Sequence, residues 1–291
     1  MADVDAPTVA LFGPTGMGKT EIALALARLL DAEIVSADSM QVYRGLPILT
    51  NQPTPSQLAL VPHHLVGVLD PRQECSAAEY ARLAGAVVDD IRARGRRVVL
   101  EGGSGLYLRA GLGGLAFGAP PSPTHRAALE HLAESDPQAL LERLRAADPR
   151  AYEAIDRANL RRVVRAVETA EAHDRPSAAG QRGRLWDAQG APHAFRLFAL
   201  DVDRTRLRER VDARVDEMVA RGLVDEVAAL PQPLSRTVRQ AIGVREILSY
   251  LAGELTLDEA TSRMKSRTRG YVRRQLTWMR KLDADIIPAS A

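Results

Sequence analysis

A glycine-rich segment near the start of the chain has the residue types and spacing that bind phosphate. It matches the pattern G-x-x-x-x-G-K-[ST], and its residues are Gly13, Pro14, Thr15, Gly16, Met17, Gly18, Lys19 and Thr20. Glycines let backbone N–H groups converge on anionic oxygens, and the N-terminus of a following helix adds positive partial charge. Lys19 adds a full charge, and the Thr20 hydroxyl can bind Mg²⁺. The segment therefore predicts a site for a di- or triphosphate group, whatever molecule carries it.

The elements around this loop alternate between strand and helix. An apolar strand is expected at Val9–Phe12 and a helix with an apolar stripe at Thr20–Leu30. A second strand begins at Ile34–Val35, and a third at Arg97–Leu100 follows a helix at Ala77–Arg94. This alternation predicts a mostly parallel sheet, in which ligands bind beyond the carboxyl ends of the strands.

Two polar residues lie at such strand ends. Asp38 follows the second expected strand, and Ser104 follows the third within Gly-Gly-Ser-Gly. Either side chain could face a ligand bound at the phosphate loop. From spacing alone, Asp38 is also explained as a loop or capping residue, and Ser104 as a turn residue.

The middle of the chain differs in composition and in its expected secondary structure. Glycines and prolines crowd the segment Gly111–Pro123, and three helical segments follow at His125–Glu134, Pro137–Ala146 and Leu160–His173. We therefore expect a helical insertion at 118–194 within an α/β core formed by 1–117 and 195–291. After a strand at Phe195–Asp201, the pattern predicts helices up to Arg221, then at Leu223–Leu230, Arg239–Leu251 and Leu257–Lys281.

Composition restricts the class of protein. The 291 residues are 46% hydrophobic and 26% charged, which is typical of a globular chain with its own core. The single cysteine, Cys75, excludes an internal disulfide and a cysteine-rich zinc site. No apolar run approaches the roughly 18–20 residues of a membrane span, and the start lacks the features of a secretory signal. We expect a cytoplasmic protein.

Positive charge is concentrated near the end of the chain. The segment Thr261–Leu282 contains eight basic residues and no acidic residue. Such clustering predicts a local positive field. A solvated helix face explains the same residues equally well.

Several segments in a fixed order resemble one family, the tRNA dimethylallyltransferases, also called tRNA isopentenyltransferases or IPP transferases. The loop reads Gly-Pro-Thr-x-x-Gly-Lys-Thr, and Asp38 opens the pattern Asp-Ser-x-Gln-x-Tyr-x-Gly. The other matching segments are Pro62–Leu65, Gly102–Tyr107, Arg165–Glu168, Leu207–Val227, Gln240–Gly243 and Arg273–Trp278. The phosphate loop alone is shared by many families, but this ordered set is specific and extends over nearly the whole chain.

The resemblance implies a P-loop NTPase-like parallel sheet flanked by helices, with an inserted all-helical domain that contacts tRNA. It implies transfer of a dimethylallyl group from dimethylallyl diphosphate to N6 of an adenosine, with Mg²⁺ as cofactor. That adenosine lies next to the anticodon on its 3′ side, and the products are N6-(dimethylallyl)adenosine and diphosphate. The implied partner is the anticodon stem-loop of tRNA. The chain is expected to be a monomer and to have no membrane partner.

The resemblance also assigns roles to residues. Asp38 would take the proton of the adenine amine, while Ser104 and Arg210 would stabilise the departing diphosphate. Without the resemblance, Arg210 is a surface helix arginine. Implied tRNA contacts are Asp38, Ser39, Met40, Gln41, Ser104, Arg161, Arg162, Val163, Val164, Arg165, Gln240, Ala241, Ile242, Gly243, Val244 and Arg245. The basic segment Arg263–Lys281 would contact tRNA phosphates.

The chain departs from the family pattern at three places. Ser104 replaces a usual threonine and keeps the hydroxyl. The segment Ile48–Pro53 lacks the lysine of the usual Ile-Gly-Thr-Ala-Lys-Pro, and Glu101 stands where a small or apolar residue is common. These changes concern the substrate pocket rather than the reaction.

Two other functions fit the same phosphate loop. A P-loop kinase acting on a small metabolite would bind ATP and need no basic surface of tRNA size. A nucleotide-driven RNA-binding switch would bind RNA in an NTP-dependent way and leave Asp38 without a role. Comparing the binding of ATP with that of dimethylallyl diphosphate separates all three.

Overall fold

The structure is a computed structural model that describes residues 6–115, 122–173, 193–201, 203–282 and 284–288. Contacts between residues divide the chain into two units, Met1–Leu115 with Ala188–Ala291, and Ala116–Asp187. The first unit ends at 115 and resumes at 188, where the sequence predicted 117 and 195. Much of the difference lies outside the described residues.

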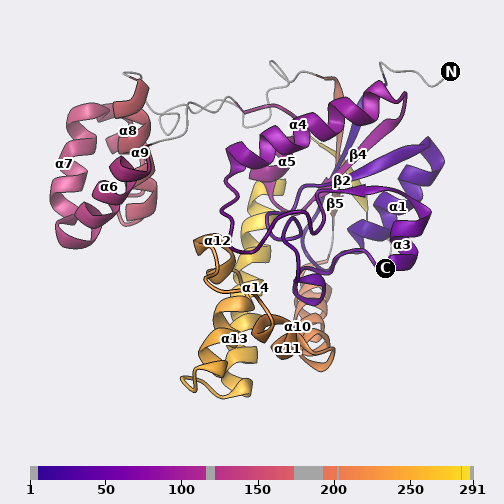
Figure 1. The fold of residues 1–291 in the computed structure, drawn as a ribbon. Helices are drawn as coiled ribbons and strands as arrows, with labels where there is room; N and C mark the ends of the chain where they lie inside the picture. Colours follow the sequence, from indigo (N-terminus) through magenta and orange to yellow (C-terminus); the bar gives the residue numbers. More distant parts are fainter. Residues whose placement is uncertain (1–5, 116–121, 174–192, 202, 283, 289–291) are drawn as a thin grey trace. The chain divides into compact units, whose positions relative to one another are not determined.

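The first unit is built on one parallel sheet (Figure 1). Its strand order is β3-β2-β4-β1-β5-β6, and every neighbouring pair is parallel. The strands are β1 Thr8–Phe12, β2 Ala32–Ser36, β3 His63–His64, β4 Arg97–Gly102, β5 Phe195–Asp201 and β6 Asp285–Pro288. The parallel sheet predicted from the alternating elements is thereby confirmed. Strands β3 and β6 were not predicted, because two and four residues are too short for a periodic signal.

Helices cover both faces of the sheet. On one face α1 (Lys19–Leu30), α10 (Arg204–Ala220) and α14 (Leu257–Met279) share a core with the strands. That core contains Leu11, Ala23, Ala27, Ile34, Val99, Leu200, Leu207, Val211 and Val272. On the other face α4 (Ala77–Ala93) and α5 (Gly105–Gly111) lie together (Figure 1). Within the described residues, no helix is both long and apolar enough to cross a membrane.

The predicted helix Arg239–Leu251 is wrong, because the structure has two helices there. Helix α12 spans Arg236–Arg239 and α13 spans Val244–Leu251. The break is at Gly243, whose φ of 101° lies in a region that favours glycine. A Cβ at this position would lie 2.2 Å from Leu49 Cδ1. The backbone N–H of Gly243 donates to Glu246 Oε2 at 2.8 Å.

Three short helices complete the first unit: α2 Pro47–Thr50, α3 Pro55–Leu60 and α11 Leu223–Ala228. The carboxylate of Glu226 in α11 accepts hydrogen bonds from the backbone N–H groups of Ile48 (2.6 Å) and Leu49 (2.8 Å). This contact satisfies two N–H groups at the start of α2 that have no partner within the helix. The segment that departs from the family pattern is therefore anchored by a residue far along the chain.

The second unit is a small helical bundle. It contains α6 Pro123–Ser135, α7 Pro137–Ala147, α8 Pro149–Ala154 and α9 Leu160–His173. Asp136 and Asp148 cap α7 and α8, each directly before a proline at the first helical position. The core includes Leu129, Leu140, Leu144, Val163 and Val167. The helical character predicted for this region is present in its described part, with α8 as an additional helix.

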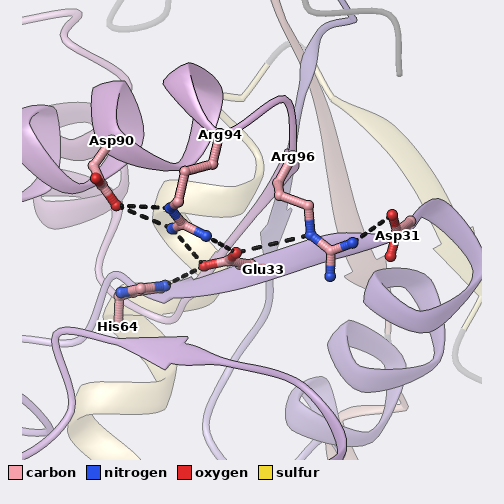
Figure 2. Close-up of polar contacts among 6 residues, drawn as sticks. All are labelled: Asp31, Glu33, His64, Asp90, Arg94 and Arg96. Carbon is pink, nitrogen blue, oxygen red and sulfur yellow. Dashed lines mark hydrogen bonds and ion pairs between the residues drawn. The ribbon is translucent and has the colours of Figure 1, made fainter. Parts of the chain in front are cut away.

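A polar network surrounds the buried Glu33 near the amino end of β2 (Figure 2). Arg94 donates to both carboxylate oxygens, with Nη2 to Oε2 at 2.9 Å, and His64 Nε2 donates to Oε2 at 2.6 Å. Arg94 also pairs with Asp90 at 3.0 Å, and Arg96 pairs with Asp31 at 2.5 Å. These contacts join β2, β3, α4 and the start of β4. They lie near the amino end of β2, whereas Asp38 follows its carboxyl end.

Candidate active site

A polar pocket lies beyond the carboxyl ends of β1, β2 and β4. Its walls come from the phosphate loop, the segment after β2, α2 and its following turn, the end of β4, and α10. The lining residues are Thr15, Gly16, Met17, Gly18, Lys19, Thr20, Glu21, Ser36, Asp38, Gln41, Thr50, Asn51, Gln57, Glu101, Gly102, Gly103 and Arg214. The structure thus brings Asp38 and the phosphate loop to one pocket.

The phosphate loop has the backbone geometry that its sequence predicts. Gly16 and Gly18 have φ of 88° and 71°, a conformation that glycine adopts without steric cost. Gly18 is the N-cap of α1, and the first residues of that helix, whose N–H groups have no acceptor in a preceding turn, line the pocket. The Nζ of Lys19 donates to the Pro14 carbonyl at 3.0 Å. Burial lowers the pKa of Lys19, and the carboxylates of Glu101 and Asp38 oppose that shift.

Asp38 is held by one carboxylate oxygen and leaves the other available. Its Oδ1 accepts hydrogen bonds from the backbone N–H groups of Met40 (2.8 Å) and Gln41 (3.3 Å). Within the described chain, Oδ2 has no hydrogen-bond partner. Two backbone bonds orient the carboxylate, so that its second oxygen can accept a proton from a bound group.

Gln41 shapes the wall next to Asp38. Its side-chain Oε1 accepts from Ser36 Oγ at 2.7 Å, and Nε2 donates to the carbonyls of Thr50 (3.1 Å) and Asn51 (3.2 Å). The buried amide is therefore occupied by contacts within the protein. Ser39 and Met40 are partly exposed beside it.

Ser104 lies next to the lining residues but is not one of them. It is the N-cap of α5 and its hydroxyl makes no capping hydrogen bond. Gly102 and Gly103, directly before it, line the pocket. A Cβ at Gly102 would lie 2.4 Å from the Ala37 carbonyl oxygen, so the end of β4 and the turn before Asp38 pack closely.

The structure brings Arg214 to the pocket, and not Arg210. Arg210 is exposed on α10, whereas Arg214, one helical turn later, lines the pocket. The Nε of Arg214 is buried and has no hydrogen-bond partner among the described residues. Burial lowers the pKa of Arg214, and Asp38 opposes the shift. Arg214 lies seven residues after Leu207 and therefore on the same side of α10, but only the packing of Leu207 in the core shows which side faces the sheet.

Glu101 is a second lining residue that sequence reasoning did not assign. It is 5% exposed, and Thr20 Oγ1 donates to its Oε1 at 3.4 Å. Burial raises the pKa of this carboxyl, and Lys19 opposes the shift. The sequence marked the position only as a departure from the family pattern.

The expected tRNA-contact segments contain both surface and core residues. On α9, Arg161, Arg162 and Arg165 are exposed, while Val163 and Val164 are buried in the core of the helical unit. At the α12–α13 junction, Gln240 and Arg245 are exposed, Ile242 is partly exposed, and Ala241, Gly243 and Val244 are buried. Only the exposed members of these segments can present side chains to RNA.

The basic segment on α14 is partly neutralised by other helices. Lys265 pairs with Asp216 at 2.6 Å, Arg269 pairs with Asp212 at 2.7 Å, and Arg267 pairs with Glu246. These acids belong to α10 and α13, so the local sequence could not reveal them. Of the described basic residues on this helix and directly after it, exposed side chains without an ion pair are Arg263, Arg273, Arg274, Arg280 and Lys281.

Comparison with known proteins shows which family this chain belongs to. A model of the IPP transferase family matches residues 41–282. The tRNA dimethylallyltransferase of Geobacillus thermodenitrificans is 41% identical over 276 residues, covering 94% of this chain and 87% of that protein. The one of Anaeromyxobacter sp. strain K is 44% identical over 283 residues, covering 94% and 90%.

Solved structures agree with the sequence relatives. The crystal structure of full-length tRNA isopentenylpyrophosphate transferase from Bacillus halodurans superposes with a TM-score of 0.69 at 35% identity, covering 97% of this chain and 90% of that one. A eukaryotic dimethylallyltransferase acting on tRNA gives a TM-score of 0.78 at 25% identity, covering 98% of this chain and 74% of that one. The chain belongs to the IPP transferase family.

Proposed function

We propose that this protein transfers a dimethylallyl group from dimethylallyl diphosphate to N6 of the adenosine on the 3′ side of the anticodon in tRNA. The observation that carries the proposal is the meeting of three features in one pocket. These features are a phosphate loop, an arginine with an unpartnered buried nitrogen, and a carboxylate with one free oxygen. Family membership supplies the reaction that uses all three.

The diphosphate is proposed to bind at the loop. Backbone N–H groups at the start of α1 donate to its oxygens, and Lys19 supplies a full positive charge. Arg214 faces the same space and supplies the second cation, with its Nε available for a hydrogen bond. Both cations stabilise the charge that accumulates on the diphosphate as it departs. Arg214 thus takes the role that the resemblance gave to Arg210, and Ser104 remains a candidate donor at the pocket edge.

Asp38 is proposed to act as the general base. The N6 nitrogen of adenine attacks the allylic carbon that carries the diphosphate. A C–N bond forms as the C–O bond breaks, and the bonding pair of the C–O bond leaves with the diphosphate. The N6 proton passes to Oδ2 of Asp38, while Oδ1 stays bonded to the backbone.

Mg²⁺ is the proposed cofactor. When bound, it neutralises part of the charge of the diphosphate. The Thr20 hydroxyl lines the pocket and suits a cation that prefers oxygen ligands. Among the described residues, no group of three or more His, Cys, Asp or Glu side chains could hold a metal ion. Mg²⁺ at phosphate sites commonly uses one or two protein ligands together with phosphate oxygens.

The tRNA partner is proposed to contact several exposed basic groups. RNA loops are recognised through splayed bases and the backbone, and the target base must leave its stack to enter a pocket. The exposed arginines of α9, the residues Gln240 and Arg245, and the unpaired cations of α14 are the proposed contacts. We further propose that the protein acts in the cytoplasm and that it is a monomer. Light scattering after size-exclusion chromatography tests the oligomeric state.

Mass spectrometry of nucleosides tests the proposal directly. Unmodified tRNA is incubated with the protein, Mg²⁺ and dimethylallyl diphosphate, and we expect adenosine that carries one added dimethylallyl group. Parallel incubations replace dimethylallyl diphosphate with ATP. Modification or phosphoryl transfer that needs ATP, with none from dimethylallyl diphosphate, would contradict the proposal and favour the kinase or switch functions.

A further inference from the structure

The end of strand β4 carries a buried acid beside the phosphate loop. Glu101 pairs in register with Leu11 of β1 on one side and with Ser36 of β2 on the other. Its side chain lines the pocket, yet the residue is only 5% exposed. In the described chain its carboxylate has no ion pair, and its hydrogen bond from Thr20 is long, at 3.4 Å. The charged form of a buried carboxylate with so little compensation is costly unless a cation joins it.

The charges of the side chains that line the pocket also indicate that a cation binds there. Two cationic side chains, Lys19 and Arg214, line it together with three carboxylates, Glu21, Asp38 and Glu101. The excess of one acid weakens the attraction of these side chains for a diphosphate and leaves the backbone N–H groups of the loop as its main donors. A divalent cation bound between the carboxylates and the diphosphate reverses that balance.

We propose that Glu101 and Thr20 together form the divalent-cation site of this pocket. The proposal rests on the proposed function only for the identity of the anion. Carboxylate and hydroxyl oxygens are the ligands that Mg²⁺ prefers, and two oxygens on adjacent octahedral positions lie about 3 Å apart. The Thr20 and Glu101 oxygens are 3.4 Å apart, which small side-chain movement brings to that separation. Nucleotide-hydrolysing enzymes with the same loop hold Mg²⁺ with the loop hydroxyl and a strand-end acid.

This assignment gives Glu101 opposite effects on anion binding with and without metal. Without a divalent cation, its negative charge repels the diphosphate. With the cation, Glu101 holds the metal that attracts the diphosphate. A residue that only supports the fold would not change sign between the two conditions.

The test measures binding of inorganic pyrophosphate and Mn²⁺ to the full chain. Calorimetry gives the Kd of pyrophosphate with EDTA and again with saturating Mn²⁺, and electron paramagnetic resonance gives the Kd of Mn²⁺ with saturating pyrophosphate. For Glu101→Gln we expect the Mn²⁺ Kd to rise roughly 10–100-fold. We expect the Kd of pyrophosphate to fall in EDTA and to rise with Mn²⁺. An unchanged Mn²⁺ Kd, or equal weakening in both conditions, overturns the proposal.

Two further variants keep the test decisive. Glu101→Val places an apolar, β-branched residue at a buried strand position, so it is expected to fold and to lose metal binding like the glutamine variant. Glu33→Gln is the matched control, because it removes a buried strand carboxylate near the amino end of β2, which does not line the pocket. Its Mn²⁺ Kd is expected to equal that of the wild type, and a rise equal to that of Glu101→Gln overturns the proposal.

The result is independent of the proposed reaction. If the wild type fails to modify tRNA but shows the metal-dependent change of sign at Glu101, the proposed function is wrong and the metal site stands. If the wild type modifies tRNA and Glu101→Gln leaves the Mn²⁺ Kd unchanged, the metal site is wrong and the function stands.

Discussion

The side-chain amide of Gln275 on α14 joins Gly103, at the end of β4, to the phosphate loop. Its Nε2 donates to the Gly103 carbonyl at 2.7 Å, and its Oε1 accepts from the Thr15 backbone N–H at 3.2 Å. Gln275 is buried, and a Cβ at Gly103 would lie 2.3 Å from its Nε2. One residue of the C-terminal helix therefore sets the spacing between two pocket walls.

Replacing Gln275 should change diphosphate binding. Gln275→Met has similar volume and leaves both backbone groups without partners, which costs about 1–3 kcal/mol each at a buried site. We expect the KM for dimethylallyl diphosphate to rise about tenfold or more and the melting temperature to fall. Gln275→Glu should recover as pH falls, because a protonated carboxyl can again donate to Gly103. Steady-state kinetics over a pH series checks this, and two variants with the same flat profile would contradict it.

Asp38→Asn should separate chemistry from binding. It keeps the size of the side chain and an oxygen that can accept from Met40 and Gln41, but it removes the basic carboxylate. Loss of a general base typically lowers the rate about 10²–10⁴-fold. Single-turnover rates with saturating tRNA and dimethylallyl diphosphate measure the effect, and calorimetry should show nearly unchanged diphosphate affinity. A rate within a few-fold of wild type, in a folded protein, would rule out the general-base role.

Arg214 and Arg210 provide a matched pair on one helix. Arg214→Gln removes a pocket cation, and by analogy with lost transition-state donors kcat/KM should fall about 10²–10³-fold. Arg210→Gln removes an exposed arginine one turn earlier, and we expect a much smaller effect. Kinetics with dimethylallyl diphosphate as the varied substrate compares them. A larger loss at Arg210 would restore the assignment made from the family resemblance.

The unpaired cations on α14 and directly after it should contribute to the salt dependence of tRNA binding. Replacing Arg273, Arg274 and Arg280 with glutamine should weaken tRNA binding at low salt and reduce the slope of log K against log salt concentration. The expected reduction is about one for each arginine that contacts a phosphate. Arg269 is left unchanged, because its charge is paired with Asp212.

Fluorescence anisotropy with labelled tRNA measures these slopes. The control variant removes three other exposed arginines that have no ion pair in the described chain, which are Arg28, Arg44 and Arg206. Equal slopes for the two triple variants would identify the α14 residues as an ordinary solvated face. Affinity for the diphosphate should be the same in both.

The network around Glu33 should stabilise the fold above acidic pH. Hydrogen bonds from Arg94 hold the pKa of the Glu33 carboxyl below its usual value, although burial opposes them. A lowered pKa means that the contribution is present above the pKa of the unfolded chain and is lost as pH falls through the folded value. At pH 7, Glu33→Gln should lower the free energy of unfolding by about 1.5–3 kcal/mol. Urea denaturation from pH 7 to pH 3 checks this, and a difference independent of pH would contradict it.

The sequence alone determined the features that depend on local spacing. The glycines and Lys19 of the phosphate loop, the strands before and after it, and the position of Asp38 at a strand end all follow from residues close together in the chain. Their geometry is local, because a strand–loop–helix unit has few ways to place its backbone N–H groups. The parallel sheet follows from the order of such units.

Tertiary structure decided what depends on residues far apart in the chain. The segment 261–282 has no acid of its own, yet Asp212, Asp216 and Glu246 neutralise three of its cations. Arg214 rather than Arg210 reaches the pocket because the apolar stripe of α10 fixes its rotation against the sheet. The helix predicted across Gly243 is interrupted at that glycine, which has a φ of 101°, and Leu49, nearly two hundred residues earlier, occupies the space that a Cβ would need. Charge pairing, helix rotation and close packing are set by the partner surface, which local sequence patterns do not contain.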